Sequence, residues 1–289
     1  MPSVMTLIAG PDAKERLPGV AGKIAGELGS PVDWLAPGVA CDIVCDPATE
    51  AAARTAIGGL PIDVIVQPAA GRRKRLLIAD LESTIIENEM LEELADFLGL
   101  RAPVAEITRR AMNGEIDFVG ALSERVALLR GLPVSVLDEA AARIRPMPGA
   151  AALIATLRQA GVPTALASGG FTVFAELVAA RLGFDRVIAN RLDIVDGTLA
   201  GTVTPPIIGA AAKRDTLAAL ATEFGLTPAE VLAVGDGAND LPMLQAAGLG
   251  IAFRAKPAVA AASRWRIDHA DLTALLYAQG YRQEEVVEG

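Results

Sequence analysis

The chain has only one histidine, His269, among its 289 residues. This scarcity excludes metal sites built from several histidines, and it leaves a serine–histidine–aspartate triad a single candidate base. His269 stands beside Asp268 and Asp271, just before an apolar segment, where we expect a capping or solvated role. Any acid–base chemistry is therefore expected to come mainly from carboxylates or lysine.

Cysteine and aromatic residues are also scarce. Cys41 and Cys45 are four positions apart, with no second cysteine pair or histidine nearby. We expect them to be two small apolar residues on one face of a strand; zinc or a disulfide is the alternative. Apolar residues make up 52% of the chain and aromatics 4%, which predicts cores built from alanine, valine, leucine and isoleucine.

Long apolar runs and excess positive charge are absent as well. No run approaches the roughly 20 residues of a membrane span, and the N-terminus lacks the charged and apolar regions of a signal peptide. The net charge of −9 argues against nucleic acid or a membrane surface as a partner. We expect an intracellular, cytoplasmic protein with about two domains.

Residues 1–72 show the pattern of a small ferredoxin-like α+β domain. The predicted order is strand Val4–Ala9, helix Leu17–Leu28, strand Val32–Leu35, strand Val39–Cys45, helix Pro47–Ile57 and strand Ile62–Val66. The basic run Gly71–Arg75 follows. We interpret it as an interdomain linker with solvated charges rather than as a nucleic-acid contact.

Residues 73–289 alternate short apolar runs with helical segments, which predicts a doubly wound parallel α/β domain. The expected strands are Leu76–Ala79, Pro163–Ala167, Arg186–Ala189, Val231–Val234 and Leu249–Ala252; the expected helices include Ala150–Ala160, Phe171–Leu182 and Ala211–Phe224. Residues 88–146 lack a convincing strand, so we expect an inserted helical cap over the carboxyl edge of the sheet. Arg191–Pro206 predicts a hairpin with Asp196-Gly197 as its turn.

Two of these strands end in carboxylates. Leu76–Ala79 leads into Asp80, Glu82 and Thr84, and Val231–Val234 leads into Asp236, Asn239 and Asp240. Ligand sites of α/β sheets lie at the carboxyl ends of strands, so the two groups are expected to meet there. A cluster of carboxylates suits a hard divalent cation, and Mg²⁺ is the common choice with phosphate.

Two further elements suit a phosphate. Ser168 and Gly169 follow a strand and precede a helix, so a hydroxyl and free amides are expected at the same edge. Lys213 stands at the start of a later helix. Taken alone, Ser-Gly-Gly is better explained as a structural turn and Lys213 as a solvated charge. Their order and spacing relative to the acidic motifs are what indicate a phosphate site.

Together these four elements resemble the haloacid dehalogenase superfamily of phosphatases. Its pattern is an Asp-x-Asp-x-Thr strand end, a serine or threonine after the next core strand, a lysine and a paired-aspartate motif. Residues 76–276 are similar, more narrowly, to the phosphoserine phosphatases. There a glutamate nine positions after the nucleophile binds the substrate ammonium, and an arginine of the cap binds its carboxylate. Glu89 and Arg125 match these two positions, and Phe118 and Met112 would line the cap side of the pocket.

The resemblance implies a Mg²⁺-dependent hydrolysis of O-phospho-L-serine to serine and phosphate, the last step of serine biosynthesis. Asp80 would form an aspartyl-phosphate, and Glu82 would act as acid and then as base. Asp80, Asp236 and the Glu82 carbonyl would hold Mg²⁺, while Asp240 and Thr84 support that shell. Ser168, Gly169, Lys213 and Asn239 would bind the phosphoryl group. The first domain is similar in pattern to ACT-type ligand-binding domains, through which a homodimer could form.

One position departs from the family pattern, because Glu82 replaces the usual second aspartate. Glutamate keeps the acid but adds a methylene, and a displacement of about 1 Å can cost on the order of 100-fold in rate. We expect a site shaped around Glu82. Two alternatives stay open: a phosphatase or phosphotransferase for another small phosphomonoester, such as phosphohomoserine or phosphothreonine, and a catalytically impaired ligand-binding homologue.

Overall fold

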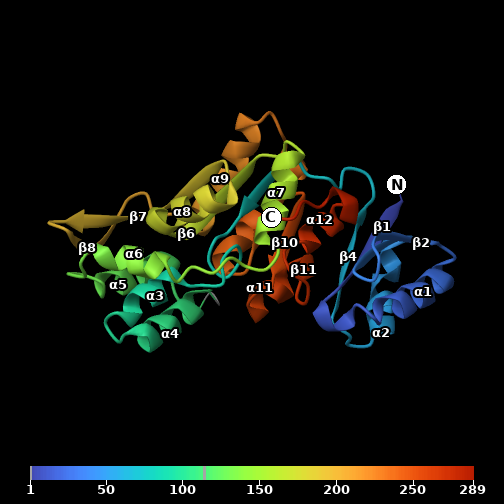
Figure 1. Cartoon of the computed structure of the whole chain (residues 1–289), viewed down its shortest axis with the longest axis horizontal. Helices are drawn as coiled ribbons and strands as arrows, with labels where there is room; N and C mark the ends of the chain where they lie inside the picture. Colours follow the sequence, from blue (N-terminus) through green and yellow to red (C-terminus); the bar gives the residue numbers. More distant parts are fainter. Residues whose placement is uncertain (1, 113–114) are drawn as a thin grey trace.

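The structure, a computed structural model, describes residues 2–112 and 115–289. The side chain of Met112, predicted for the pocket, lies outside the described residues. Two β-sheets organise the chain (Figure 1). A four-stranded sheet comes from the N-terminal residues, and a seven-stranded sheet with an inserted group of helices follows it.

The N-terminal sheet is antiparallel, with strand order β2-β3-β1-β4. Its elements are β1 (Ser3–Ala9), α1 (Leu17–Leu28), β2 (Val32–Ala36), β3 (Ala40–Cys45), α2 (Glu50–Ile57) and β4 (Ile62–Pro68). This order confirms the predicted ferredoxin-like arrangement. Alternate residues of β1 face opposite ways: Met5 and Leu7 pack under α1 and α2, whereas Ile8 packs against the rest of the chain. Cys41 and Cys45 pack on the same side of the sheet as Met5 and Leu7.

The second sheet has the order β11-β10-β9-β5-β6-β7-β8. Its strands are β5 (Leu76–Ala79), β6 (Thr164–Phe171), β7 (Arg186–Val195), β8 (Thr198–Thr204), β9 (Val231–Gly235), β10 (Leu249–Phe253) and β11 (Trp265–Ile267). All neighbouring pairs are parallel except β7 with β8. The central strand β5 thus delivers Asp80 between the ends of β6 and β9.

Helices cover both faces of this sheet. The helices are α7 (Ala150–Gln159), α8 (Thr172–Leu182), α9 (Ala210–Glu223), α10 (Leu241–Ala246), α11 (Pro257–Ala262) and α12 (Ala274–Ala278). Leu76 and Ile78 of β5 pack with α9, α10 and α11, whereas Leu77 and Ala79 pack with α7, α8 and α12. This two-sided packing confirms the predicted doubly wound α/β core.

Two details of the sheet differ from the sequence-based expectation. Strand β11 was not predicted, because three residues are too short to show a period. The predicted strand Arg186–Ala189 and the first arm of the predicted hairpin are one continuous strand, β7, which pairs with β6 and then with β8. Asp196-Gly197 forms the turn, as predicted, with both residues at positive φ.

Among the described residues, four helices between β5 and α7 form the predicted cap. They are α3 (Met90–Asp96), α4 (Arg101–Met112), α5 (Phe118–Ala127) and α6 (Ser135–Ala141). In Figure 1 they lie together beside hairpin β7–β8, away from the N-terminal sheet. Contacts between α5 and β8 hold the cap against that hairpin.

The basic run Gly71–Arg75 joins the two sheets, but its charges are not simply solvated as predicted. Arg72 pairs with Asp42 of β3 at 2.6 Å, and the buried Lys74 donates to the carbonyls of Gly71 and Ala229. Arg75 pairs with Glu230 at the surface. The carboxylates of Asp42 and Glu230 and two backbone carbonyls therefore bind the basic side chains of this run and hold the linker in place.

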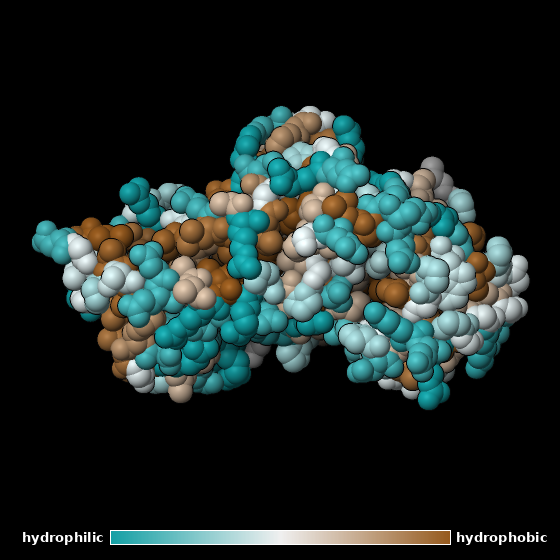
Figure 2. Space-filling view, viewed as in Figure 1, coloured by the Kyte–Doolittle hydropathy of each residue, from teal (hydrophilic) through white to brown (hydrophobic). Residues whose placement is uncertain are grey.

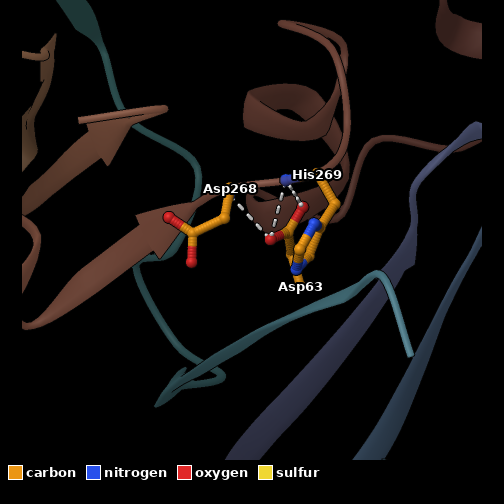
Figure 3. Close-up of side chains that lie close together, drawn as sticks. All are labelled: Asp63, Asp268 and His269. Atoms are coloured by element: carbon orange, nitrogen blue, oxygen red, sulfur yellow. Dashed lines mark hydrogen bonds between the residues drawn. The ribbon is translucent and has the colours of Figure 1, made fainter. Parts of the chain in front are cut away.

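Asp63 of β4 makes the most concentrated contact between the two sheets (Figure 3). Its buried carboxylate accepts hydrogen bonds from the backbone amides of Asp268 (2.8 Å), His269 (3.2 Å) and Ala270 (2.9 Å). Both carboxylate oxygens of Asp63 accept hydrogen bonds in this way. The close approach of Asp63, Asp268 and His269 is therefore explained by the hydrogen bonds that backbone amides donate to Asp63. His269 thus takes part in this contact through its backbone amide.

The surface offers no membrane-spanning element among the described residues, because no helix there is long and apolar enough to cross a bilayer. Figure 2 shows apolar residues gathered over hairpin β7–β8 and the adjoining part of the core. Exposed large apolar side chains of this region include Leu177, Ile194 and Val195. Within residues 2–72, Val44 alone is exposed in this way.

The Asp63 contact predicts a stability effect. Asp63→Asn replaces one acceptor oxygen with an amide group that faces backbone donors, so we expect a loss of about 1–3 kcal/mol in the free energy of unfolding. Asp33→Asn is the matched control, because Asp33 joins the same two parts through an exposed pair with Arg282, worth about 1 kcal/mol or less. Denaturant unfolding of both variants measures the difference; equal small losses would show that Asp63 is not a structural anchor.

Candidate active site

Three aspartates meet at the carboxyl edge of the second sheet. Carboxylate oxygens of Asp80, Asp236 and Asp240 all lie within 4.8 Å of one another, and all three residues are buried. The fully buried Lys213 reaches them from α9. Its Nζ donates to Asp80 at 2.6 Å and to Asp240 at 2.7 Å. The structure therefore brings together the two predicted acidic motifs and the predicted lysine.

Local backbone geometry explains how Asp236 and Asp240 come together. Asp240 Oδ2 accepts from the amides of Asp236 (3.2 Å) and Gly237 (3.0 Å), which closes the turn after β9. A side chain at Gly235 would meet the Asp240 carboxylate at 2.4 Å. A residue larger than glycine at 235 would therefore push Asp240 out of place.

Burial governs the charges of this cluster. It raises the pKa of Asp80 to about 8; the Asp240 carboxylate adds to the rise and the Lys213 ammonium opposes it. It also raises the pKa of Asp236 to about 7, although the Lys256 ammonium opposes that rise. Burial alone would lower the pKa of Lys213, but the Asp240 and Asp80 carboxylates outweigh it and raise this pKa. The carboxylates thus need cations close by to remain ionised.

The donors around this cluster fit a hard divalent cation. In the described structure Asn239 Oδ1, at the cavity wall, and Thr84 Oγ1, four residues after Asp80, are buried without a hydrogen-bond partner. Because buried polar atoms are normally paired, these two oxygens are free to support a further bound group. The set of oxygen donors, without sulfur or imidazole, is the one that Mg²⁺ prefers.

Glu82 and Glu89 lie beside this cluster, where the chain enters the cap. Glu82 Oε1 accepts from the amide of Met90 at 2.9 Å, at the start of α3. Glu89 Oε1 accepts from the hydroxyl of Ser83 at 2.6 Å. Ser83 has a φ of 54°, an uncommon value for a residue other than glycine, which marks a sharp turn between the two glutamates.

The two glutamates also differ from ordinary surface carboxylates. Desolvation, reinforced by the Glu89 carboxylate, raises the pKa of Glu82 to about 8. Desolvation likewise raises the pKa of Glu89, against the hydrogen bond from Ser83. A carboxyl group with such a pKa holds its proton near neutral pH, so Glu82 can donate one.

The longer side chain of Glu82 is accommodated by a glycine on the opposite strand. A Cβ at Gly170 would lie 2.9 Å from the carboxyl atoms of Glu82. The Glu82 carboxyl group therefore rests directly on the backbone of β6, between that strand and the first turn of α3.

Arg125 faces the two glutamates from the cap helix α5. It is buried, and its guanidinium donates to Thr108 Oγ1 at 2.7 Å and to the Ala121 carbonyl at 3.0 Å. Burial lowers the pKa of Arg125, while the Glu82 and Glu89 carboxylates oppose that effect. Since these bonds use part of the guanidinium fork, donors remain for a ligand.

One cavity joins these groups between cap and sheet. Seven predicted residues line it: Asp80, Glu82, Glu89, Arg125, Gly169, Asp236 and Asn239. Phe118, predicted for its cap side, also lines it. A Cβ at Gly169 would lie 2.7 Å from the Phe118 ring. The cap therefore closes directly onto the glycine after Ser168.

The other predicted site residues are buried and do not line the cavity. Ser168 is fully buried, and its Oγ accepts from the Gly170 amide at 2.9 Å, which orders the turn after β6. Lys213, Asp240 and Thr84 are fully buried as well.

Sequence reasoning missed Ser83, Thr108 and Lys256, which contact Glu89, Arg125 and Asp236. Only Ser83 stood inside a recognised motif; Thr108 and Lys256 carry no local pattern.

Comparisons with known proteins agree with this geometry. The family model "haloacid dehalogenase-like hydrolase" matches residues 77–245. A phosphoserine phosphatase of Streptomyces coelicolor is 39% identical, over 98% of this chain and 72% of the relative. One from Mycobacterium tuberculosis is 43% identical over 78% of this chain, which spans only 56% of that relative.

Solved structures extend the likeness to the whole fold. A haloacid dehalogenase family hydrolase of Salmonella enterica superposes with a TM-score of 0.84 at 29% identity, covering 96% of this chain and 98% of the other. A phosphoserine phosphatase solved as a phospho-aspartyl intermediate analogue superposes with a TM-score of 0.68 at 38% identity, over 71% of this chain and 98% of the other.

Proposed function

Because the chain belongs to the haloacid dehalogenase-like hydrolases and, within them, to the phosphoserine phosphatase family, we propose that it hydrolyses O-phospho-L-serine to serine and phosphate. One observation carries this proposal. A single cavity is lined both by Asp80 and Asp236 of the aspartate cluster and by the pair Glu89 and Arg125. The same small site would therefore bind a phosphate and an amino-acid headgroup together.

Asp80 is the proposed nucleophile. One carboxylate oxygen attacks phosphorus, the bond to the serine oxygen breaks, and an aspartyl-phosphate forms. Water then attacks phosphorus and releases phosphate and the free carboxylate. Lys213, bonded to Asp80, opposes the rise that burial causes in the pKa of this carboxyl group and orients it for attack. A phosphoserine phosphatase solved as a phospho-aspartyl intermediate analogue supports this chemistry by similarity.

Glu82 is the proposed acid and base. With its pKa raised to about 8, it can hold a proton for the departing serine oxygen. Once it has given this proton up, the carboxylate can take one from the attacking water. The hydrogen bond from the Met90 amide holds the carboxyl group in place through both steps.

Asp80, Asp236 and the Glu82 carbonyl would hold Mg²⁺, with Asp240 and Thr84 supporting them. Bound there, the cation would supply positive charge to the phosphoryl oxygens. Asn239, with a free amide oxygen, lies at the same edge of the site. Ser168, Gly169 and Lys213 are proposed to bind the phosphoryl group, Ser168 by ordering the backbone amides around it.

Glu89 and Arg125 are proposed to select the substrate. Glu89 pairs with the ammonium, and the Arg125 guanidinium offers its free donors to the carboxylate. Ser83 and Thr108 orient these two side chains. The ordered packing of Glu82 over Gly170 favours a working acid over a decayed site, so we prefer the enzyme to an impaired binding protein.

We also propose two domains, 1–72 and 73–289, with the cap inserted at 88–146, and a cytoplasmic location, which suits the free thiols Cys41 and Cys45. Homodimerisation through the first domain and an ACT-type ligand stay predictions. The sheet of that domain packs one face on its own helices and the other on the second domain, so an additional partner would have to use other surfaces.

The covalent step yields the first functional prediction. Asp80→Asn is nearly isosteric, so we expect a folded protein without turnover, because a carboxamide does not attack phosphorus. The wild type should bind beryllium fluoride with Mg²⁺ at Asp80, as fluorine NMR would detect, and the variant should not. Retention of most activity by Asp80→Asn would favour direct attack by water.

Arg125 is expected to set the preference for phosphoserine over phosphoethanolamine, which lacks the carboxylate. Loss of one charge-assisted contact is worth about 1.5–3 kcal/mol, or roughly 10- to 150-fold. Arg125→Ala should lose most of the ratio of the two kcat/KM values. Arg130→Ala, an exposed arginine just after the same helix, is the control and should keep the ratio. An unchanged ratio in Arg125→Ala would remove Arg125 from substrate recognition.

Glu82 is tested by the leaving group. A serine alkoxide needs a proton donor, whereas nitrophenolate leaves readily without one. Glu82→Gln should therefore slow phosphoserine cleavage far more than the nitrophenolate burst from p-nitrophenyl phosphate. The burst isolates the first step from the second, in which Glu82 acts as base. Equal losses with both substrates would mean that Glu82 is not the acid.

A further inference from the structure

Lys256 contacts the aspartate cluster from a direction that the proposed mechanism does not use. It follows strand β10 and directly precedes helix α11. Its backbone amide donates to the Asp236 carbonyl at 3.1 Å, and its Nζ donates to Asp236 Oδ2 at 2.7 Å. Lys256 is therefore fastened to Asp236 through both main chain and side chain.

The ammonium of Lys256 also acts on the carboxylates beyond Asp236. Its charge favours the ionised forms of Glu89 and Glu92, and it is itself stabilised by Asp236, Glu89 and Asp80. The Lys256 side chain keeps 31% of its surface exposed, against 5% for Asp236. A long, partly solvated side chain of this kind can leave its partner without a large rearrangement of the fold.

The charges around the cavity explain why the contact between Lys256 and Asp236 matters. Among the described residues, the carboxyl groups gathered here include those of Asp80, Glu82, Glu89, Asp236 and Asp240, and Glu92 also interacts with the Lys256 charge. Three cationic side chains face them, from Lys213, Arg125 and Lys256. Lys213 and Arg125 are buried and held by two bonds each. Lys256 is thus the partly exposed member of the three, next to the proposed metal ligand.

We propose that Lys256 is a resident counter-cation of the Mg²⁺ site: it neutralises Asp236 when no metal is bound and competes electrostatically with the ion. The inference rests on the proposed function, since it takes Asp236 as a metal ligand. Two like charges cannot share one carboxylate without repulsion. Lys256 therefore stabilises the metal-free protein and weakens Mg²⁺ binding, which keeps the ion exchangeable.

Removal of the Lys256 charge should raise the affinity for Mg²⁺ and lower the Tm of the metal-free protein. In Lys256→Met, Mg²⁺ should bind more tightly, by about 10-fold, within the usual range of coupling between two bound species. The metal-free variant should also melt at a lower temperature than the metal-free wild type, because Asp236 has lost its partner. Added Mg²⁺ should close that gap in Tm, since ligand binding stabilises the folded state.

The experiment is calorimetric titration of the full-length, metal-stripped protein with Mg²⁺ alone, together with thermal unfolding in EDTA and in Mg²⁺. Lys256→Arg keeps the charge and should bind Mg²⁺ as the wild type does. Arg264→Met removes an exposed cation two residues after α11. Because its guanidinium stacks on the Trp265 ring at 4.4 Å, this variant controls the Mg²⁺ affinity alone, which should not change. The measurement needs no turnover, so a protein that binds Mg²⁺ in this way without hydrolysing phosphoserine would refute the proposed function alone.

Weaker Mg²⁺ binding in Lys256→Met would overturn the inference and make Lys256 a positioning residue that orients Asp236 for the ion. Unchanged affinity would overturn it too, because the ammonium would then have no influence on the site. If Lys256→Met proved unfolded without metal, Mg²⁺-dependent refolding of that variant would still support the inference, and failure to refold at saturating Mg²⁺ would contradict it.

Discussion

The ammonium of Lys213, bonded to both Asp80 and Asp240, is the interaction on which the site depends. All three groups are buried, and unpaired buried charges are strongly unfavourable. The bridge therefore ties the end of β5, the turn after β9 and the start of α9 into one arrangement. That turn also positions Asp236, because the backbone amide of Asp236 donates to the Asp240 carboxylate. The sheet brings the strand ends together at one edge, and the Lys213 bridge fixes the positions of the carboxylates there.

The rest of the molecule closes around this edge from two sides. The cap brings Arg125 over the cavity and presses Phe118 against Gly169. On the other side, the loop that Asp63 holds leads into Leu272, whose amide donates to the carbonyl of Pro148 where the chain returns from the cap. The N-terminal sheet is thus linked, through the loop before Leu272, to the segment in which the chain leaves the cap. It helps to hold that segment in place but lines no part of the cavity.

Much of this architecture could be predicted from the sequence, because it rests on periodic apolar runs and on motifs at strand ends. The order of strands and helices, the cap and the meeting of Asp80 with Asp236 follow from such local signals. Contacts between distant residues could not be predicted. Lys256 reaches Asp236 only because β10 lies beside β9 in the sheet, and the three-residue strand β11 has no readable period. Asp63 looked like an ordinary strand residue, since its partners are backbone amides that leave no trace in sequence.

The central claim is that the aspartate cluster and the pair Glu89 and Arg125 act together on phosphoserine. It is tested most directly by phosphate release from O-phospho-L-serine, measured on metal-stripped protein with Mg²⁺ added back, beside phosphoethanolamine and p-nitrophenyl phosphate. The account predicts release that requires Mg²⁺ and is fastest, by kcat/KM, with phosphoserine among the two amine-bearing substrates. Mg²⁺-dependent release from p-nitrophenyl phosphate without a preference for phosphoserine would contradict the assigned substrate, and no release from any of the three would contradict the assigned chemistry.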